Sequence, residues 1–242
     1  PKPQTPNPKP QPLKKFQKIK KRLLFFKKEN NYKTDKVFHA EGWLKIVFIL
    51  STLLFIPGTR LSVLRVPLMV AVCLLAIRRQ MKITKINLEV LKGVLVNEFG
   101  ANLFYALFLW ASPNASIIFF VPINLHFMIG AAEFIERGQP ALLLRIPKVS
   151  QFAAAVKHSR EHIKILRTYT ELILFVYVLL LMFLRFNSFA LPMMLYSYLK
   201  LKGATKVGKA ALLRVRQELA AKLSRFGIVA KAVDAFLSFL IK

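Results

Sequence analysis

The side chains most able to do chemistry in this 242-residue chain lie inside two of its most apolar runs. Six polar, ionisable or small residues recur there at i, i+4 and i+7: Glu98, Asn102 and Tyr105, then His126, Gly130 and Glu133. This spacing puts each trio on one face of a helix. Ionisable groups inside apolar segments suggest a proton path, a contact with a lipid headgroup or partner, or hydrogen-bonded helix packing.

Helix packing is the interpretation that the sequence favours. In an antiparallel hairpin Asn102 and His126 lie at similar depth, and Glu98 lies opposite Gly130–Glu133 at the basic inner edge. Small and polar side chains that face each other hold helices together in lipid. A proton path would need a relay of ionisable groups across the full thickness, and the outer stretches FYALFLW and ASIIFFVP offer no such relay. We therefore expect these six residues to pack the two segments together.

Motifs for enzyme chemistry are missing from the sequence. It has no Gly-rich phosphate loop, nucleophile elbow or zinc-spaced Cys/His set. His158 and His162 stand at i, i+4, but no third ligand accompanies them, so a solvated basic face is expected. The single cysteine, Cys73, lies in an apolar run and is predicted to be a small buried hydrophobe. We expect a protein that is not an enzyme and has no metal or cofactor.

Six apolar segments must position these side chains. We place them at 43–57, 61–77, 94–110, 115–135, 171–185 and 186–200. Several are shorter than the ~20 residues that cross a bilayer comfortably. The predicted fold is an all-α membrane protein with about six short transmembrane or hairpin helices, in a membrane domain at 41–202.

The charges between the segments predict how the chain is threaded. Strongly basic connections alternate with connections that carry little or no charge. By the positive-inside rule both ends of the chain then lie on the same, positive side. Three short hairpins that enter one leaflet as wedges fit the same charges, so full spans and wedges both remain open. Arg78 and Arg79, in the second connection, are candidate lipid- or partner-binding residues.

The N-terminal 40 residues are a separate basic region. Residues 1–12 have six prolines and predict an extended arm. Residues 13–40 form a basic amphipathic segment, predicted to be a helix in a lipid interface or docked on a protein. Its candidate lipid- or partner-binding residues are Lys14, Lys15, Phe16, Lys18, Lys20, Lys21, Arg22, Lys27 and Lys28.

The C-terminal residues 203–242 form two further amphipathic helices. Their apolar stripes are Leu212, Val215, Leu219, Leu223 and Phe226, then Val229, Val233, Phe236 and Leu240. The whole chain has a net charge of +27, concentrated at its two ends. Since the loops lack the aromatic-basic interleaving of single-strand nucleic-acid platforms, nucleic acid is not an expected partner. The expected partners are anionic lipids such as cardiolipin, and other membrane proteins in a larger complex.

Three stretches give the chain a resemblance to the transmembrane protein 33 family. They are RVPLMVAVCLLAIRRQMKI, VLVNEFGANLFYALFLW and FALPMMLYSYLKLKGATKVGKAALLRVRQEL, within about residues 43–226. The resemblance implies a non-catalytic membrane protein of the endoplasmic reticulum and nuclear envelope that shapes or organises membrane. It also implies that the C-terminal amphipathic helices touch membrane. The first 40 residues are not covered by it.

Two other functions remain open. One is an accessory structural subunit of a respiratory complex in the mitochondrial inner membrane. Strong basicity, short apolar segments and a first residue, Pro1, that is not Met fit this alternative. The other is a transporter or enzyme that uses Glu98, His126 or Glu133. The sequence ranks the membrane scaffold first and the transporter or enzyme last.

Overall fold

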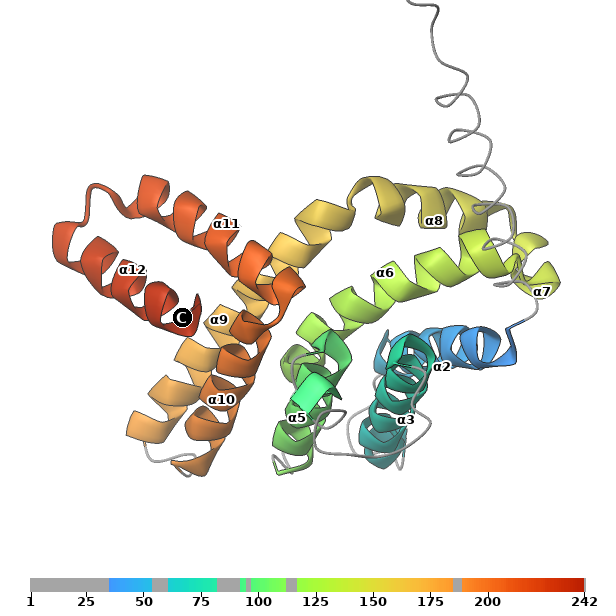
Figure 1. The fold of residues 1–242 in the computed structure, drawn as a ribbon, viewed down its shortest axis with the longest axis horizontal. Helices are drawn as coiled ribbons and strands as arrows, with labels where there is room; N and C mark the ends of the chain where they lie inside the picture. Colours follow the sequence, from blue (N-terminus) through green and yellow to red (C-terminus); the bar gives the residue numbers. More distant parts are fainter. Residues whose placement is uncertain are drawn as a thin grey trace, which may run out of the picture.

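A computed structural model describes residues 35–53, 61–81, 92–94, 97–111, 117–184 and 189–241. Within these residues every element is helical, which confirms the all-α prediction (Figure 1). The arm at 1–12 lies outside the described residues, and so do the candidate binding residues of the basic segment: Lys14, Lys15, Phe16, Lys18, Lys20, Lys21, Arg22, Lys27 and Lys28.

Six main helices coincide with the six predicted segments. They are α2 (Lys36–Leu53), α3 (Leu61–Met81), α5 (Glu98–Trp110), α6 (Val121–Gly138), α9 (Arg160–Phe183) and α10 (Ala190–Ala204). A short 3₁₀ helix, η1 (Ile117–Phe120), leads into α6. The existence of these helices therefore follows from the apolar runs, although their ends differ.

The largest difference in boundaries is at the fifth segment. The apolar run suggested a start at residue 171, but α9 begins at Arg160, after α7 (Ala141–Leu144) and α8 (Pro147–His158). The first half of α9 is rich in charge, so hydropathy alone does not mark it as part of an apolar helix. Arg167 and Glu171 pair at i, i+4 on this helix, and each lowers the cost of burying the other.

Two stretches within the described residues are long and apolar enough to cross a membrane, by length and composition: Ile118–Gly138 and Arg160–Phe183. Three of the other helices fall short of this for simple reasons. With 13 and 15 residues, α5 and α10 are shorter than the ~20 residues of a comfortable span. Helix α2 has 18 residues but carries Lys36, Glu41 and Lys45.

The helices pack as a chain of neighbours around one large apolar cluster. Helix α2 contacts α3 and α6, α5 contacts α3 and α10, and α6 also contacts α8 and α9. In Figure 1, α8 lies along α6, while α9 and α10 run side by side. Phe48, Phe120 and Phe127 meet at the α2–α6 contact, with Phe48 and Phe127 in edge-to-face geometry at 5.0 Å. This packing fixes the helices that carry the polar residues described below.

The C-terminal helices α11 (Lys206–Leu223) and α12 (Gly227–Ile241) fold against α9 and α10 (Figure 1). The inner members of their predicted stripes, Leu212, Val215 and Leu240, are buried. Leu212 and Leu240 belong to the same apolar cluster as Leu174 of α9 and Leu199 of α10. Much of the two stripes is therefore covered by protein, while Phe226 and Val229 at the α11–α12 turn stay exposed.

Candidate functional site

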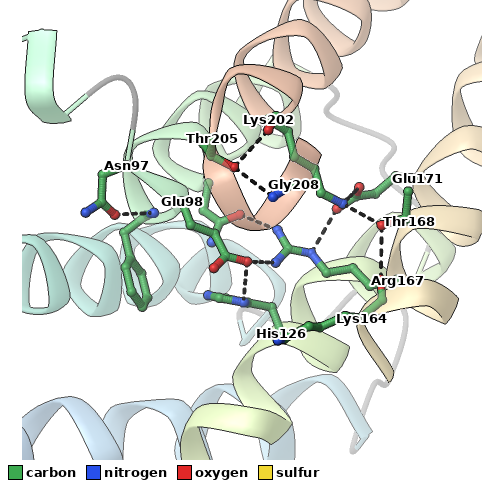
Figure 2. A network of polar contacts seen from close by, with 12 residues as sticks. Asn97, Glu98, His126, Lys164, Arg167, Thr168, Glu171, Lys202, Thr205 and Gly208 are labelled. Atoms are coloured by element: carbon green, nitrogen blue, oxygen red, sulfur yellow. Dashed lines mark hydrogen bonds and ion pairs between the residues drawn. The ribbon is translucent and has the colours of Figure 1, made fainter. Parts of the chain in front are cut away.

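Arg167 of α9 lies at the centre of a buried polar network (Figure 2). Its Nε donates to Glu171 Oε1 at 2.9 Å, and its Nη1 donates to Glu98 Oε1 at 2.6 Å. Its Nη2 donates to Asn102 Oδ1 at 2.7 Å and to the Tyr198 hydroxyl at 3.1 Å. One guanidinium thus connects α5, α9 and α10. Its planar set of N–H donors suits it to several acceptors at once.

Lys202 of α10 extends the network on the other side of Glu171. Its ammonium pairs with Glu171 Oε2 and donates to Thr168 Oγ1 at 3.1 Å. The Tyr198 hydroxyl donates to Glu171 Oε1, so both carboxylate oxygens of this fully buried residue have partners. The backbone carbonyl of Lys202 accepts from Thr205 Oγ1 at 2.8 Å, and Thr205 Oγ1 in turn accepts from the Gly208 backbone N–H at 3.0 Å, which caps α11 (Figure 2).

Three pairs at i, i+4 supply most of the network. Glu98 and Asn102 lie on α5, Arg167 and Glu171 on α9, and Tyr198 and Lys202 on α10. Residues at this spacing share one helix face, so each helix presents two polar side chains at one level.

Of these three pairs, only the one on α5 was predicted from the sequence. The pairs on α9 and α10 could have been predicted in the same way, because each places a charged side chain inside or beside an apolar run.

His126 of α6 lies at the edge of the network. Its Nδ1 is 3.3 Å from Glu98 Oε1, and its ring packs edge-on against Phe99 at 5.2 Å. His126 Nε2 and Asn102 Nδ2 are buried and have no hydrogen-bond partner within the described residues. The network thus reaches a fourth helix.

The charges of the network balance, which explains how it can be buried. Glu98 and Glu171 carry two negative charges, and Arg167 and Lys202 carry two positive charges. A buried ion is tolerated when it is paired and its remaining hydrogen-bonding positions are filled. Two cavities open elsewhere on the described surface, and none of Glu98, Arg167, Glu171 and Lys202 lines either of them. The arrangement is therefore suited to holding helices together.

The other predicted packing residues have different partners. The Tyr105 hydroxyl donates to the backbone carbonyl of Phe119 at 2.6 Å, which ties α5 to η1. Gly130 lies against Lys45 of α2, and Glu133 pairs with Arg137 on its own helix at 2.8 Å. Glu98 therefore meets α9 and His126 instead of the Gly130–Glu133 stretch that the hairpin register predicted. The reason is that α5 packs on α3 and α10, while α6 packs on α2, α8 and α9.

A second, smaller ion-pair cluster joins α2 to α3. Arg79 was predicted to bind lipid or a partner, but its Nε lies 3.0 Å from the buried carboxylate of Glu41. Its guanidinium also lies 4.9 Å from the ring centroid of Phe38. Lys45 pairs with the same carboxylate. Arg78 is exposed, so of the two arginines it is the one available to an outside partner.

The described part of the chain holds no group of three His, Cys, Asp or Glu side chains that could bind a metal ion. Comparison with known proteins adds no assignment: no family model, curated protein or solved structure matches this chain. The resemblance to the transmembrane protein 33 family remains a prediction.

Proposed function

We propose that this protein is a non-catalytic, multi-pass membrane scaffold that shapes or organises its bilayer and binds other membrane proteins. The observation that carries the proposal is the arrangement of polarity around α9. Arg167 and Glu171 point into the protein, where they are paired and buried. The opposite face of the same helix is apolar and exposed. A soluble helix has the reverse arrangement.

The exposed face of α9 is large. Its members are residues with between 52% and 71% of their surface exposed: Leu166, Ile173, Val176, Leu180 and Phe183. Soluble monomers rarely expose contiguous apolar patches of this kind. Lipid or a neighbouring membrane protein would remove this surface from water. Leu53, Trp110 and Phe189 at other helix ends are also exposed and support the same placement.

Exposed positive charge gathers at the start of α9 and on the elements before and after this helix. Exposed basic residues follow α6 and continue through α11: Arg145, Lys148, Lys157, Arg160, Lys206, Lys209 and Arg214. Such residues favour the side of a membrane that presents anionic lipid. They support a topology with the α6–α9 connection and the C-terminal hairpin on one membrane face, as the positive-inside rule predicts.

The short helices suggest how such a scaffold acts. Helices α5 and α10 do not reach the full thickness of a bilayer with ease, so their hairpins would occupy one leaflet more than the other. Unequal occupancy of the two leaflets favours curved membrane. The resemblance to the transmembrane protein 33 family points to the endoplasmic reticulum or nuclear envelope as the site of this action.

Reconstitution of the purified protein into large vesicles tests the proposal. We expect conversion to tubules or small vesicles at high protein load, with a stronger effect when the vesicles contain anionic lipid. Electron microscopy and light scattering measure the change. Unchanged vesicle size at high load would contradict membrane shaping.

The exposed α9 face supports a second candidate, the accessory subunit of a mitochondrial respiratory complex. The same apolar surface would then be covered by a neighbouring subunit, and the basic residues would meet cardiolipin. Co-migration with a respiratory complex on native gels would favour this candidate. Staining of the endoplasmic reticulum would exclude it.

A further inference from the structure

A groove opens between α9 and the two C-terminal helices, and nothing in the polar network uses it. It has a volume of about 420 Å³, within the ~300–1,000 Å³ of small-molecule sites. Its walls include Leu172, Ile173, Val176 and Leu180 of α9, Leu219 of α11 and Val233 of α12. We call this space the α9–α12 groove. In Figure 1 the hairpin of α11 and α12 lies beside α9.

The walls of the α9–α12 groove are held in place by contacts around it. Arg216 of α11 and Asp234 of α12 form a two-pronged ion pair, with Nη2 to Oδ2 at 2.9 Å. The rings of Phe175 on α9 and Phe236 on α12 stack at 5.4 Å. The Tyr169 hydroxyl of α9 donates to Glu218 Oε2 of α11 at 2.8 Å. The groove is thus formed by the folded protein itself.

The lining of the α9–α12 groove selects the chemistry of its occupant. The side chains facing the space are aliphatic or aromatic, and the Tyr169 hydroxyl is already bonded to Glu218. A ligand with polar groups would lose its hydrogen bonds to water here and gain few in return. A hydrocarbon chain loses nothing and removes Ile173, Val176 and Leu180 from contact with solvent.

The charge at the rim selects the headgroup that goes with such a chain. The Lys222 ammonium lies 5.9 Å from the centroid of the Tyr169 ring, which lines the groove. From residue 206 to residue 231 the hairpin carries seven basic residues and one acidic residue. We propose that the α9–α12 groove binds one acyl chain of an anionic phospholipid whose headgroup contacts Lys222.

This site rests on the membrane placement in the proposed function, but it does not depend on membrane shaping. A lipid held in the groove would stay with the protein when detergent removes the surrounding bilayer. The bound lipid would also fill the seam between α9 and the C-terminal hairpin, and so stabilise the hairpin's docking.

The test uses the full-length protein purified in detergent. It is titrated with phosphatidylglycerol or with phosphatidylcholine that has the same acyl chains. Native mass spectrometry counts the lipid molecules that stay bound. We expect one phosphatidylglycerol to be retained, with phosphatidylcholine bound more weakly. Val176→Trp fills the groove, and it should lower retention of both lipids about tenfold, because several methylene groups lose their burial. Leu166→Trp is the matched control, since Leu166 is 52% and Val176 53% exposed on the same helix and Leu166 does not line the groove.

A second pair of variants tests the headgroup. Lys222→Gln should weaken the binding of phosphatidylglycerol about fivefold and leave the binding of phosphatidylcholine unchanged. Lys231→Gln, which removes an exposed charge from α12, should leave the binding of both lipids unchanged. If Val176→Trp prevents folding, Val233→Phe fills the groove from α12 and gives the same readout.

Three results would overturn this site. The first is equal lipid retention by the Val176→Trp and Leu166→Trp proteins. The second is equal affinity of the unmodified protein for the two lipids. The third is a groove occupied by a second protein, or by a second copy of this chain, in place of lipid. Retained lipid together with unchanged vesicle shape would refute membrane shaping and leave the lipid site standing.

Discussion

Arg167 shows how strongly one side chain can determine the packing of this protein. Its guanidinium donates to two carboxylates, one amide oxygen and one hydroxyl, on its own helix and on α5 and α10. If the guanidinium is removed, Glu98 and Glu171 lose a cation that they share. Glu171 keeps Lys202, but within the described residues Glu98 keeps only the weaker contact with His126.

Arg167→Met should therefore lower the free energy of unfolding by about 3–5 kcal/mol, the usual cost of breaking a buried ion pair by removing one partner. Denaturant titration of the detergent-solubilised protein measures the loss. Lys164→Met is the control: Lys164 pairs with the half-exposed Glu161 on the same helix, and its loss should cost under about 1 kcal/mol. Similar losses for the two variants would show that the network does not hold the helices together.

The hydroxyl of Tyr105 allows the contribution of a single hydrogen bond to be tested. Its hydroxyl is buried and donates to the Phe119 carbonyl at 2.6 Å. Tyr105→Phe should cost about 1–3 kcal/mol, since the carbonyl is left without its partner. Tyr177→Phe, at a position 42% exposed, should change the unfolding free energy by less than about 0.5 kcal/mol. An equally small effect at residue 105 would mean that water replaces the lost hydroxyl.

At the scale of elements, the C-terminal hairpin depends on a close approach between α10 and α12. A Cβ atom at Gly203 would lie 2.0 Å from the backbone oxygen of Leu240. Backbone atoms cannot turn away as a side chain can, so the two helices must separate if that atom is added.

Gly203→Ala should displace α12 from α10 and raise the rate of hydrogen exchange along α12. Gly227 is the matched control, because a Cβ atom there would meet no atom of the described residues within 4 Å. Gly227→Ala should leave exchange unchanged or slow it slightly, since alanine restricts the unfolded chain. Exchange along α12 that is unaffected by Gly203→Ala would contradict the close approach.

The ion pair between α11 and α12 predicts a dependence on pH. The hydrogen bond from Arg216 lowers the pKa of the Asp234 carboxyl in the folded protein. A carboxyl with a lowered folded pKa stabilises the fold above its ordinary value of about 4, and loses that contribution as pH falls through the folded pKa. Relative to an unstructured peptide at the same pH, hydrogen exchange of α12 should become faster below about pH 4 in the native protein. Asp234→Asn should remove this part of the pH dependence, and an unchanged profile would show that other carboxyls cause it.

At the scale of the whole molecule, the segregation of charge predicts sidedness in a membrane. Lys148 on α8 and Lys209 on α11 are both exposed, and the proposed topology puts them on the same face. Cysteines introduced at these two positions should react together, from one side only, with a membrane-impermeant maleimide in sealed vesicles. Native Cys73 is fully buried and gives a low background. Reaction from opposite sides would refute the proposed topology.

Part of the architecture could be read directly from residue types. Apolar runs located six helices, because a helix that buries an apolar surface needs a nearly continuous supply of it. The i, i+4 spacing of Glu98 and Asn102 predicted that both lie on one helix face, and in the structure both accept a hydrogen bond from Arg167. Cys73 was correctly expected to be buried.

Tertiary structure decided which polar residues meet. The sequence suggested partners for Glu98 from the adjacent segment, but α5 and α6 contact different neighbours, so Arg167 and Tyr198 complete the network from far along the chain. Periodicity fixes the face on which a side chain lies because it depends only on local backbone geometry. It cannot fix which helix covers that face, because this depends on the summed packing of every helix in the molecule.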